Sequence, residues 1–339
     1  MTLLLKETMC NPVHLPEVLL RITVNDKSSQ CPLSNKFGAE PNTWEGLLLK
    51  AYELDLNVVG VAFHVGSGCT RVDSFTEALN DTAELFELSR KMELQRKINK
   101  TKGELNRKHI DFHTMNVIDI GGGFPGDAAN QDFPAMVTQI NDFINGEWCK
   151  QWTKKRKLEA FPEFDLTFIS EPGRFFAHQS TTLITNICGL KICQNEERKT
   201  MNYYLNDGVY GSFNNLVYDH AIIKPPLHHR DYIKVIRCGN LIAESSVVDS
   251  LCPNSTNETQ EDKKIPVYFS RFFGPTCDGF DVIMEIEFPL LAEGEVIVWF
   301  DMGAYTQAAA SKFNGFEPPK KIYLPSACNK DVHRSRGYI

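Results

Sequence analysis

The stretch that most constrains this chain is residues 116–126, which read N-V-I-D-I-G-G-G-F-P-G. A short apolar run of strand type breaks there into three consecutive glycines, Gly121, Gly122 and Gly123. Because glycine has no Cβ, the backbone can turn sharply and its N–H groups can approach an anion such as a phosphate. The spacing matches neither the dinucleotide fingerprint nor the P-loop. The stretch therefore predicts either an anion site or a tight strand-to-helix turn without a ligand.

Length, charge and cysteine usage set the outer limits. The 339 residues are 42% hydrophobic and 23% charged, which is typical of a soluble chain with enough material for two domains. A net charge of −7 argues against a general nucleic-acid binder. No apolar run approaches the roughly 18 residues of a membrane span, and the first ten residues do not resemble a signal peptide. The ten cysteines lack metal or C-x-x-C spacing, which favours a reduced cytoplasmic protein without a metal site.

Strand and helix patterns alternate through the first half of the chain. Strands are expected at residues 18–24, 58–65, 116–120 and 166–170, and helices at residues 43–54, from Ser74 through the polar stretch 91–109, and at 133–144. Glu77, three residues after Ser74, indicates a capping box. This alternation predicts an α/β domain with parallel strands. A closed barrel needs eight strand–helix units, so four units fit either an open doubly wound sheet or a chain that starts midway through a domain.

The second half reads as a separate β domain. Strand patterns at residues 181–187, 202–205, 265–269, 281–288 and 295–300 are separated by glycine and proline breaks. Residues 231–264 include a polar stretch without periodicity, which predicts a flexible insertion. The basic run K-K-R-K at residues 154–157 is typical of a localisation or nucleic-acid patch, but the acidic total favours a solvated helix end.

A set of short motifs runs in order along nearly the whole chain. They are F-H-V-G-S-G-C at 63–69, D-I-G-G-G-F-P-G at 119–126, E-P-G-R at 171–174, N-D-G-V-Y-G-S-F at 206–213, Y-D-H-A at 218–221, G-P-T-C-D-G at 274–279, M-G-A-Y-T at 302–306 and F-N-G-F at 313–316. The set resembles eukaryotic ornithine decarboxylases. The resemblance implies a PLP-binding (β/α)8-type barrel of the alanine-racemase type, here N-terminally truncated and covering residues 1–178. A C-terminal β domain would follow at residues 179–339.

The resemblance also implies a cofactor site for pyridoxal 5'-phosphate. The phosphate would lie on residues 121–123 together with Ser67, Arg174 and Tyr305. An arginine suits this role because it is permanently charged and forks two donors. Glu171 would pair with the ring nitrogen and keep it protonated, which strengthens the electron sink. Read without the family, Glu171 and Arg174 fit a plain salt bridge better than a cofactor site.

Further residues receive catalytic and substrate roles from the same resemblance. His64 would stack on the PLP ring, although a histidine that ends an apolar strand is also typical of a hydrogen-bonded core residue. Tyr218 and Asp219 would bind the distal ammonium of a basic amino acid. Cys277 would protonate the α-carbon after loss of CO₂, and Asp278 would hold the substrate amine, both in the neighbouring subunit of a homodimer. By itself Cys277 reads as a loop thiol.

Departures from the family pattern lower the expectation of activity. No Y-A-V-K-C-N-like strand with the PLP-binding lysine occurs in this sequence, and Pro32 stands where the family has an active-site arginine. The stretches at about residues 90–112 and 231–269 are longer than is usual. Two functions therefore stay open. One is PLP-dependent decarboxylation of L-ornithine to putrescine in polyamine biosynthesis, with lysine, arginine or diaminopimelate as related substrates. The other is that of a non-catalytic antizyme-inhibitor-like protein that binds antizyme.

Overall fold

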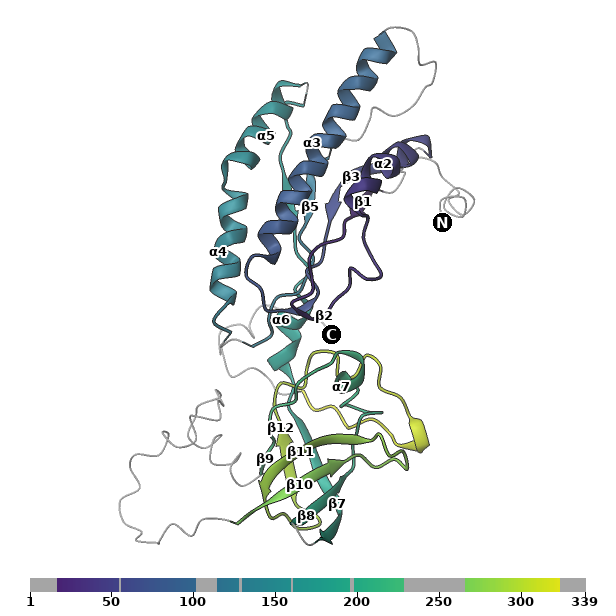
Figure 1. Cartoon of the computed structure of the whole chain (residues 1–339), viewed down its shortest axis with the longest axis vertical. Coiled ribbons are helices and arrows are strands. Elements are labelled where there is room, and N and C mark those ends of the chain that lie inside the picture. The colour runs from purple at the N-terminus through teal and green to yellow at the C-terminus, as the bar shows by residue number, and fades with distance from the viewer. Residues whose placement is uncertain are drawn as a thin grey trace, which may run out of the picture. The chain divides into compact units, whose positions relative to one another are not determined.

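The computed structural model describes residues 17–54, 56–101, 115–127, 130–159, 161–195, 198–228 and 266–323. The chain divides into two compact units (Figure 1). Unit 1 contains the described residues up to Leu183, together with Asp219–Lys224 and Trp299–Tyr305. Unit 2 contains Ile184–Tyr218 and the described parts of residues 225–298 and 306–323. The expected insertion at residues 231–264 lies outside the described residues.

A four-stranded parallel sheet forms the centre of unit 1. Its strands, in spatial order, are β1 (Glu17–Arg21), β3 (Asn57–Ala62), β5 (Val117–Asp119) and β6 (Thr167–Ile169). The spatial order follows the chain order. Because a doubly wound sheet reverses its strand order at a switch point, the doubly wound alternative is wrong and the sheet corresponds to part of a barrel.

Four helices pack with this sheet into one hydrophobic core: α2 (Trp44–Glu53), α3 (Ser74–Thr101), α4 (Phe133–Ile144) and α5 (Glu147–Leu158). Phe75 and Leu79 of α3 and Val61 and Ile118 of the sheet are completely buried. The continuous apolar strands predicted from the sequence are therefore covered as a parallel sheet requires. Figure 1 shows α3 beside α4 and α5.

The start of α3 differs from the sequence prediction in one respect. The helix begins at Ser74 as expected, but the Oγ of Ser74 is buried without a hydrogen-bond partner in the described part of the chain. The Glu77 carboxylate instead pairs with the guanidinium of Arg71, with 2.9 Å between Oε2 and Nη1. The predicted capping box is wrong, because the nearby arginine takes the carboxylate that the box needs.

Short elements complete unit 1. β2 (Ser29–Cys31) pairs antiparallel with β4 (Ser67–Cys69), and η1 (Pro41–Thr43) leads into α2. The loop after β6 enters α6 (Gly173–Ala177), which is followed by η2 (His178–Ser180). These elements carry Ser67 and Arg174.

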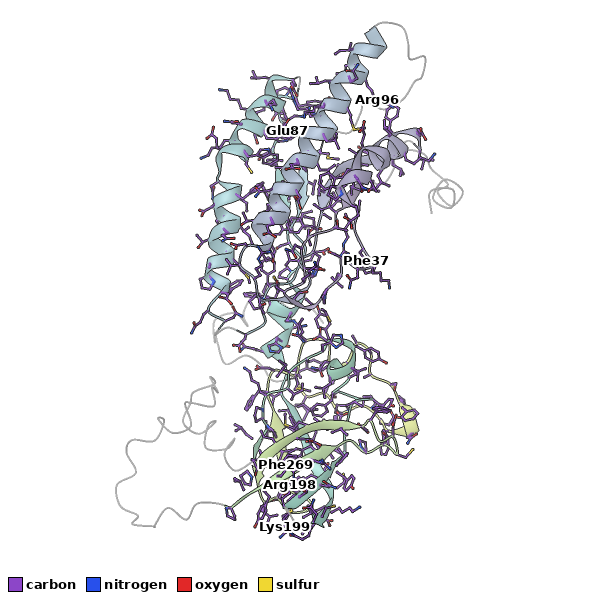
Figure 2. All side chains as sticks on the ribbon, viewed as in Figure 1. Phe37, Glu87, Arg96, Arg198, Lys199 and Phe269 are labelled. Carbon is purple, nitrogen blue, oxygen red and sulfur yellow. The ribbon has the colours of Figure 1, made fainter. Side chains whose placement is uncertain are left out.

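A mixed six-stranded sheet dominates unit 2. Its spatial order is β11 (Val282–Pro289), β10 (Val267–Phe273), β8 (Lys199–Leu205), β7 (Leu183–Gln194), β12 (Val296–Trp299) and β9 (Leu227–His228). The short helices α7 (Asn215–Tyr218) and η3 (Phe313–Gly315) lie outside it. Tyr203 and Phe272 stack in the core with ring centroids 5.2 Å apart. Just before β8, the Arg198 guanidinium lies 3.6 Å from the centroid of Phe269 on β10 (Figure 2).

Candidate active site

The glycine loop follows β5 at the carboxyl end of the sheet. Gly121 and Gly123 have φ angles of 61° and 102°, in the left-handed region that favours glycine. A Cβ on Gly121 would lie 2.1 Å from the carbonyl oxygen of Phe63, and one on Gly122 would lie 2.6 Å from that of Glu171. The loop is thus a close-packed backbone turn that no other residue type fits.

His64 lies beside this loop, just after β3. The Gly66 N–H donates to Nδ1 at 3.0 Å, so in a neutral ring the proton is on Nε2. Nε2 faces the loop, because a Cβ on Gly122 would lie 2.9 Å from it. Burial, followed by the positive charge of Arg21, holds the pKa of His64 below its ordinary value. The imidazole is therefore neutral at pH 7.

Arg174 is the centre of a buried polar cluster. Its Nη2 donates to both carboxylate oxygens of Asp219 at 2.7 Å and to the Ser67 hydroxyl at 2.8 Å. The side chains of Arg174 and Asp219 are 9% and 8% exposed. The guanidinium carbon also lies 5.0 Å from the ring centroid of Tyr305. Three sequence-predicted residues therefore meet on one guanidinium.

The Arg174–Asp219 cluster keeps an unused donor. The Nε of Arg174 is buried and has no hydrogen-bond partner among the described residues. A buried guanidinium N–H without an acceptor costs free energy, which an added anion can recover. On the other side of the pair, the backbone carbonyl of Asp219 accepts a hydrogen bond from Nε2 of Gln30 at 2.6 Å, which ties Asp219 to β2.

The segment that carries Tyr305 is fixed by ion pairs and close packing. Lys224 Nζ lies 2.7 Å from Asp301 Oδ2 and 3.1 Å from Asp127 Oδ2, just beyond the glycine loop. Asp301 and Tyr305 both have φ of 60°, which is uncommon for residues with a side chain. Such backbone conformations persist where the surroundings hold them in place. Lys224 is one of these restraints.

Glu171 approaches the glycine loop through its backbone. The Glu171 N–H donates to the carbonyl of Gly121 at 2.7 Å, and Glu171 is exposed to solvent. The sequence also allowed a plain salt bridge between Glu171 and Arg174. In the structure, the carboxylate partner of Arg174 is Asp219 instead. Arg174 and Asp219 are 45 residues apart in the sequence, so no local sequence pattern indicates that they pair.

Cys277 and Asp278 belong to unit 2. The thiol of Cys277 is exposed and accepts a hydrogen bond from Asn314 Nδ2 at 3.1 Å. The Tyr210 hydroxyl donates to Oδ2 of Asp278, and the Phe280 N–H donates to Oδ1 at 3.0 Å. The Phe280 N–H and then the tyrosine hydroxyl lower the pKa of Asp278, while the same contact raises the pKa of Tyr210 to about 12. Asp278 is therefore ionised at neutral pH.

Asp281 organises this turn and was missed by the sequence analysis. It is 1% exposed, and its Oδ2 accepts from the N–H and the hydroxyl of Thr276 at 3.0 and 2.7 Å. Its Oδ1 accepts from the Val209 N–H at 2.8 Å, so it joins the G-P-T-C-D-G and N-D-G-V-Y-G turns. No sequence signal separates such an aspartate from an exposed loop residue.

Tyr218, a predicted substrate-binding residue at the end of α7, is 68% exposed.

The predicted site residues thus fall into three groups. Ser67, Arg174, Asp219 and Tyr305 meet around one guanidinium. His64 and Glu171 meet the glycine loop at Gly122. The third group, the Cys277 turn with Tyr218, belongs to unit 2.

The chain matches a known protein family. The model of the family described as "Pyridoxal-dependent decarboxylase, pyridoxal binding domain" matches residues 4–178. Ornithine decarboxylase of Cricetulus griseus is 34% identical over 331 residues, which are 95% of this chain and 59% of that protein. Antizyme inhibitor 2 of Xenopus laevis is 35% identical over 93% of this chain and 58% of that protein. The chain thus spans well under two thirds of the relatives' length.

Solved structures agree with the fold. The arginine decarboxylase of Paramecium bursaria Chlorella virus bound to agmatine superposes with a TM-score of 0.62 at 28% identity, covering 89% of this chain and 64% of that one. The lysine/ornithine decarboxylase of Vibrio vulnificus complexed with cadaverine gives a TM-score of 0.59 at 26% identity, covering 91% and 64%.

Proposed function

Because the chain belongs to the family of pyridoxal-dependent decarboxylases, we propose that it forms the phosphate-binding and amine-recognising part of an enzyme that converts L-ornithine to putrescine. The cluster of Arg174, Asp219 and Ser67 beside the glycine loop is the observation that carries this proposal. It offers one fixed positive charge and one buried carboxylate. A basic amino acid and a phosphorylated cofactor need these two complementary charges.

The residues fit a phosphate group. The backbone of residues 121–123 turns where any Cβ would collide. The Gly121 N–H already donates to Oδ1 of Asp119 at 2.8 Å, so the N–H groups of Gly122 and Gly123 would be the loop's donors to a phosphate. Arg174 has a buried N–H without an acceptor, and Ser67 supplies a hydroxyl on the same guanidinium. Arg174, Ser67, Tyr305 and the loop would therefore hold the phosphate of pyridoxal 5'-phosphate. When bound, that cofactor supplies an electron sink for the bond that is cleaved.

The remaining unit 1 residues would orient the cofactor and substrate. His64 is neutral and hydrogen-bonded through Nδ1, so its ring is held in one orientation suited to stacking. Glu171 follows β6 and contacts the glycine loop through its backbone. Its carboxylate would pair with the ring nitrogen of the cofactor. Asp219 would accept the distal ammonium of the substrate as a second cationic partner, because positive charge stabilises a buried carboxylate. Its present partner is Arg174, so phosphate and substrate binding are coupled through one guanidinium.

The Cys277 turn would act in the site of a partner subunit in a homodimer. Cys277 would give its Sγ proton to the α-carbon after CO₂ has left. Asp278, ionised and held by Tyr210, would share the substrate ammonium with the partner's Asp219. A carboxylate on each side of one ammonium selects the length of the substrate chain, which favours ornithine over lysine. We propose that this homodimer forms and acts in the cytoplasm.

A non-catalytic role has its own support. The similarity to an antizyme inhibitor is as high as the similarity to the decarboxylases, and the sequence has no Y-A-V-K-C-N-like strand. In this second reading, the chain keeps the fold and binds antizyme. Solved structures of an arginine and a lysine/ornithine decarboxylase resemble this chain. Lysine and arginine are therefore alternative substrates if the chain belongs to a decarboxylase.

One pair of assays separates the two functions. Because the sequence has no Y-A-V-K-C-N-like strand, the chain is fused at its N-terminus to a segment that carries this strand. The fusion is supplied with PLP and with carboxyl-labelled ornithine, lysine or arginine, and the released CO₂ is counted. In parallel, its binding to purified antizyme is measured by calorimetry. Release that is fastest from ornithine and abolished by Asp219→Ala supports the decarboxylase. Antizyme binding without any CO₂ release contradicts it and supports the inhibitor-like role.

A further inference from the structure

Gln30 is a half-buried residue of β2 that lies outside every motif singled out in the sequence. Its Nε2 donates to the backbone carbonyl of Asp219 at 2.6 Å, across a sequence separation of 189 residues. The ribbon formed by β2 and β4 pairs Cys31 with Ser67, which places Gln30 opposite Gly68. A Cβ on Gly68 would lie 2.9 Å from Oε1 of Gln30, so the glutamine side chain occupies the space that this glycine leaves. The ribbon thus contacts the segment that carries Asp219.

The ribbon has restraints of its own besides this contact. Asp26 is 4% exposed, and its Oδ2 accepts from the N–H groups of Leu33 and Ser34 at 2.5 and 2.8 Å. The Thr70 hydroxyl donates to the carbonyl of Ser28 at 2.8 Å. These bonds hold the ribbon together whether or not Gln30 reaches Asp219. The hydrogen bond from Gln30 therefore serves the segment that it contacts.

The peptide group that accepts this hydrogen bond has an uncommon neighbour. The carbonyl of Asp219 belongs to the peptide bond that precedes His220, and His220 has a φ of 50°, which is unusual for a residue with a side chain. Residues 219–224 form neither helix nor strand. Such a conformation persists where its surroundings hold it in place. Gln30 fixes the plane of this peptide, and with it the direction in which the Asp219 backbone presents its carboxylate.

Both oxygen partners of Arg174 are held by the same ribbon. Ser67 lies on β4, and its hydroxyl accepts from Nη2 of Arg174 at 2.8 Å. The Asp219 carboxylate meets the same nitrogen at 2.7 Å and is restrained through Gln30 on β2. These residues all belong to unit 1. Because the ion pair is buried, water cannot compensate for a displaced carboxylate, and a small shift of Asp219 is costly.

We infer that Gln30 is a positioning residue for amine recognition. It fixes the main chain at Asp219 so that the carboxylate meets Arg174 and, in the decarboxylase proposed above, the distal ammonium of the substrate. The part that concerns the ammonium rests on the proposed function. The effect of Gln30 on the Arg174–Asp219 pair does not.

A double-mutant cycle in two backgrounds of the full chain tests the inference. Urea unfolding gives the coupling energy between Arg174→Met and Asp219→Leu in the wild-type chain and in Gln30→Met, which keeps the side-chain length and removes the donor. The coupling energy should fall by about half or more in Gln30→Met, because the carboxylate is no longer held against the guanidinium.

The matched control is Thr70→Val, which removes another side-chain hydrogen bond of the same ribbon. It should lower the stability of every protein in the cycle alike and leave the coupling energy unchanged. A coupling energy that stays the same in Gln30→Met, or falls equally in Thr70→Val, overturns the inference. In either case Gln30 would support the ribbon without positioning Asp219.

Substrate selectivity gives a second readout, which does not require Arg174→Met to fold. In the fusion that supplies the Y-A-V-K-C-N-like strand, Gln30→Met should lower kcat/KM for ornithine about fivefold. It should change kcat/KM much less for norvaline, which is ornithine without the distal amino group, and Thr70→Val should affect neither. Equal losses for both amino acids overturn the inference. A fusion that releases no CO₂ from ornithine contradicts the proposed function instead, and the coupling energy then decides the inference alone.

Discussion

The guanidinium of Arg174 holds both carboxylate oxygens of Asp219 at 2.7 Å, and both side chains are buried. The two residues come from the short helix after β6 and from the segment at residues 219–224, which returns to unit 1. Such a pair is expensive to break from one side, because the residue that remains is a buried and uncompensated charge. The pair therefore ties the two binding roles proposed for this site to the stability of unit 1.

Single substitutions of this pair should cost more than the double substitution. Arg174→Met or Asp219→Leu should each lower the free energy of unfolding by about 3–5 kcal/mol. The double variant should lose less than the sum, since neither charge is left unpaired. Urea unfolding of all four proteins gives the coupling energy. Additive losses would mean that the contact does not persist in solution.

The glycine loop should not tolerate a methyl group. Gly121→Ala should destabilise the chain strongly, because its Cβ would lie 2.1 Å from the Phe63 carbonyl at a φ of 61°. Gly46→Ala, in α2 with no atom near its Cβ, should instead stabilise it by about 0.5–1 kcal/mol. Thermal unfolding of both variants checks this contrast. A loss at Gly121 no larger than about 1 kcal/mol would contradict the close packing.

His64 should contribute a loss of stability in mild acid. Its folded-state pKa is lowered, so below its ordinary value of 6.5 the unfolded state binds the proton more readily. Stability should be unaffected by this group above pH 6.5 and should fall as the pH decreases from there towards the folded pKa. His64→Gln should flatten the plot of stability against pH in this range. The similar contribution of His178 should remain, because burial lowers the pKa of that histidine too. NMR titration of the two rings measures both values directly.

Tyr210 should keep Asp278 ionised. Tyr210→Phe removes the hydroxyl that donates to Oδ2, so the pKa of Asp278 should rise towards its ordinary value. The rise should be partial, because the Phe280 N–H, the larger cause, remains. Carbon-detected NMR titration of the Asp278 carboxyl gives the shift. An unchanged pKa would show that the tyrosine hydroxyl points elsewhere in solution.

The sequence predicted local elements well where one physical signal dominated. α4 occupies the predicted residues 133–144, and the parallel strands start within a residue or two of their apolar runs. β7 and β8 extend beyond their predicted ranges, because pairing between the two strands orders polar residues such as Lys191 and Thr200. Most of α5 was missed, since its apolar residues Cys149 and Trp152 are too few to reveal a period.

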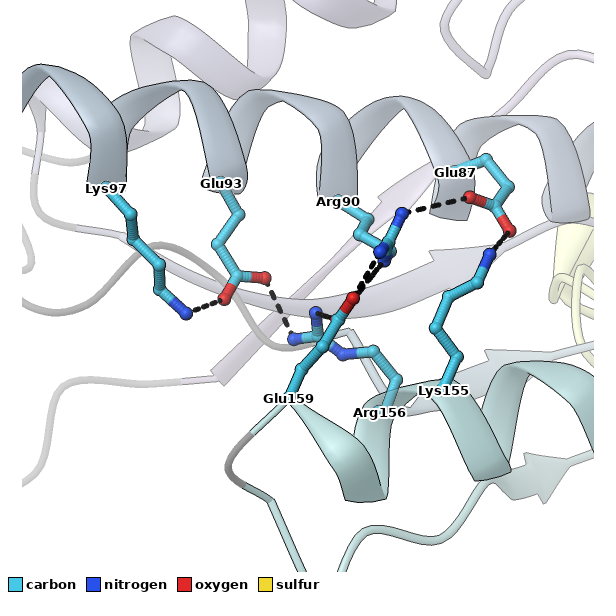
Figure 3. A network of polar contacts seen from close by, with 7 residues as sticks. All are labelled: Glu87, Arg90, Glu93, Lys97, Lys155, Arg156 and Glu159. Atoms are coloured by element: carbon cyan, nitrogen blue, oxygen red, sulfur yellow. Dashed lines mark hydrogen bonds and ion pairs between the residues drawn. The ribbon is translucent and has the colours of Figure 1, made fainter.

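The candidate site was predictable residue by residue but not as an arrangement. Motifs identified Arg174 and Asp219 separately, and only the fold brings them into contact across 45 residues. Likewise, only tertiary packing turns Lys155 and Arg156 of the basic run towards Glu87 and Glu93 of α3 (Figure 3), while Lys154 and Lys157 are exposed. Such contacts leave no local pattern in a single sequence.

The most direct test of the central claim is the affinity of the chain for PLP compared with pyridoxal, which lacks the phosphate. Equilibrium dialysis of the wild-type chain should give binding at least about tenfold tighter for PLP, as expected for charge-assisted hydrogen bonds to Arg174 and the glycine loop. In Arg174→Gln this preference should be largely lost, while Arg71→Gln, which removes an exposed guanidinium paired with Glu77, should retain it. Equal affinities for PLP and pyridoxal in the wild-type chain would contradict the account.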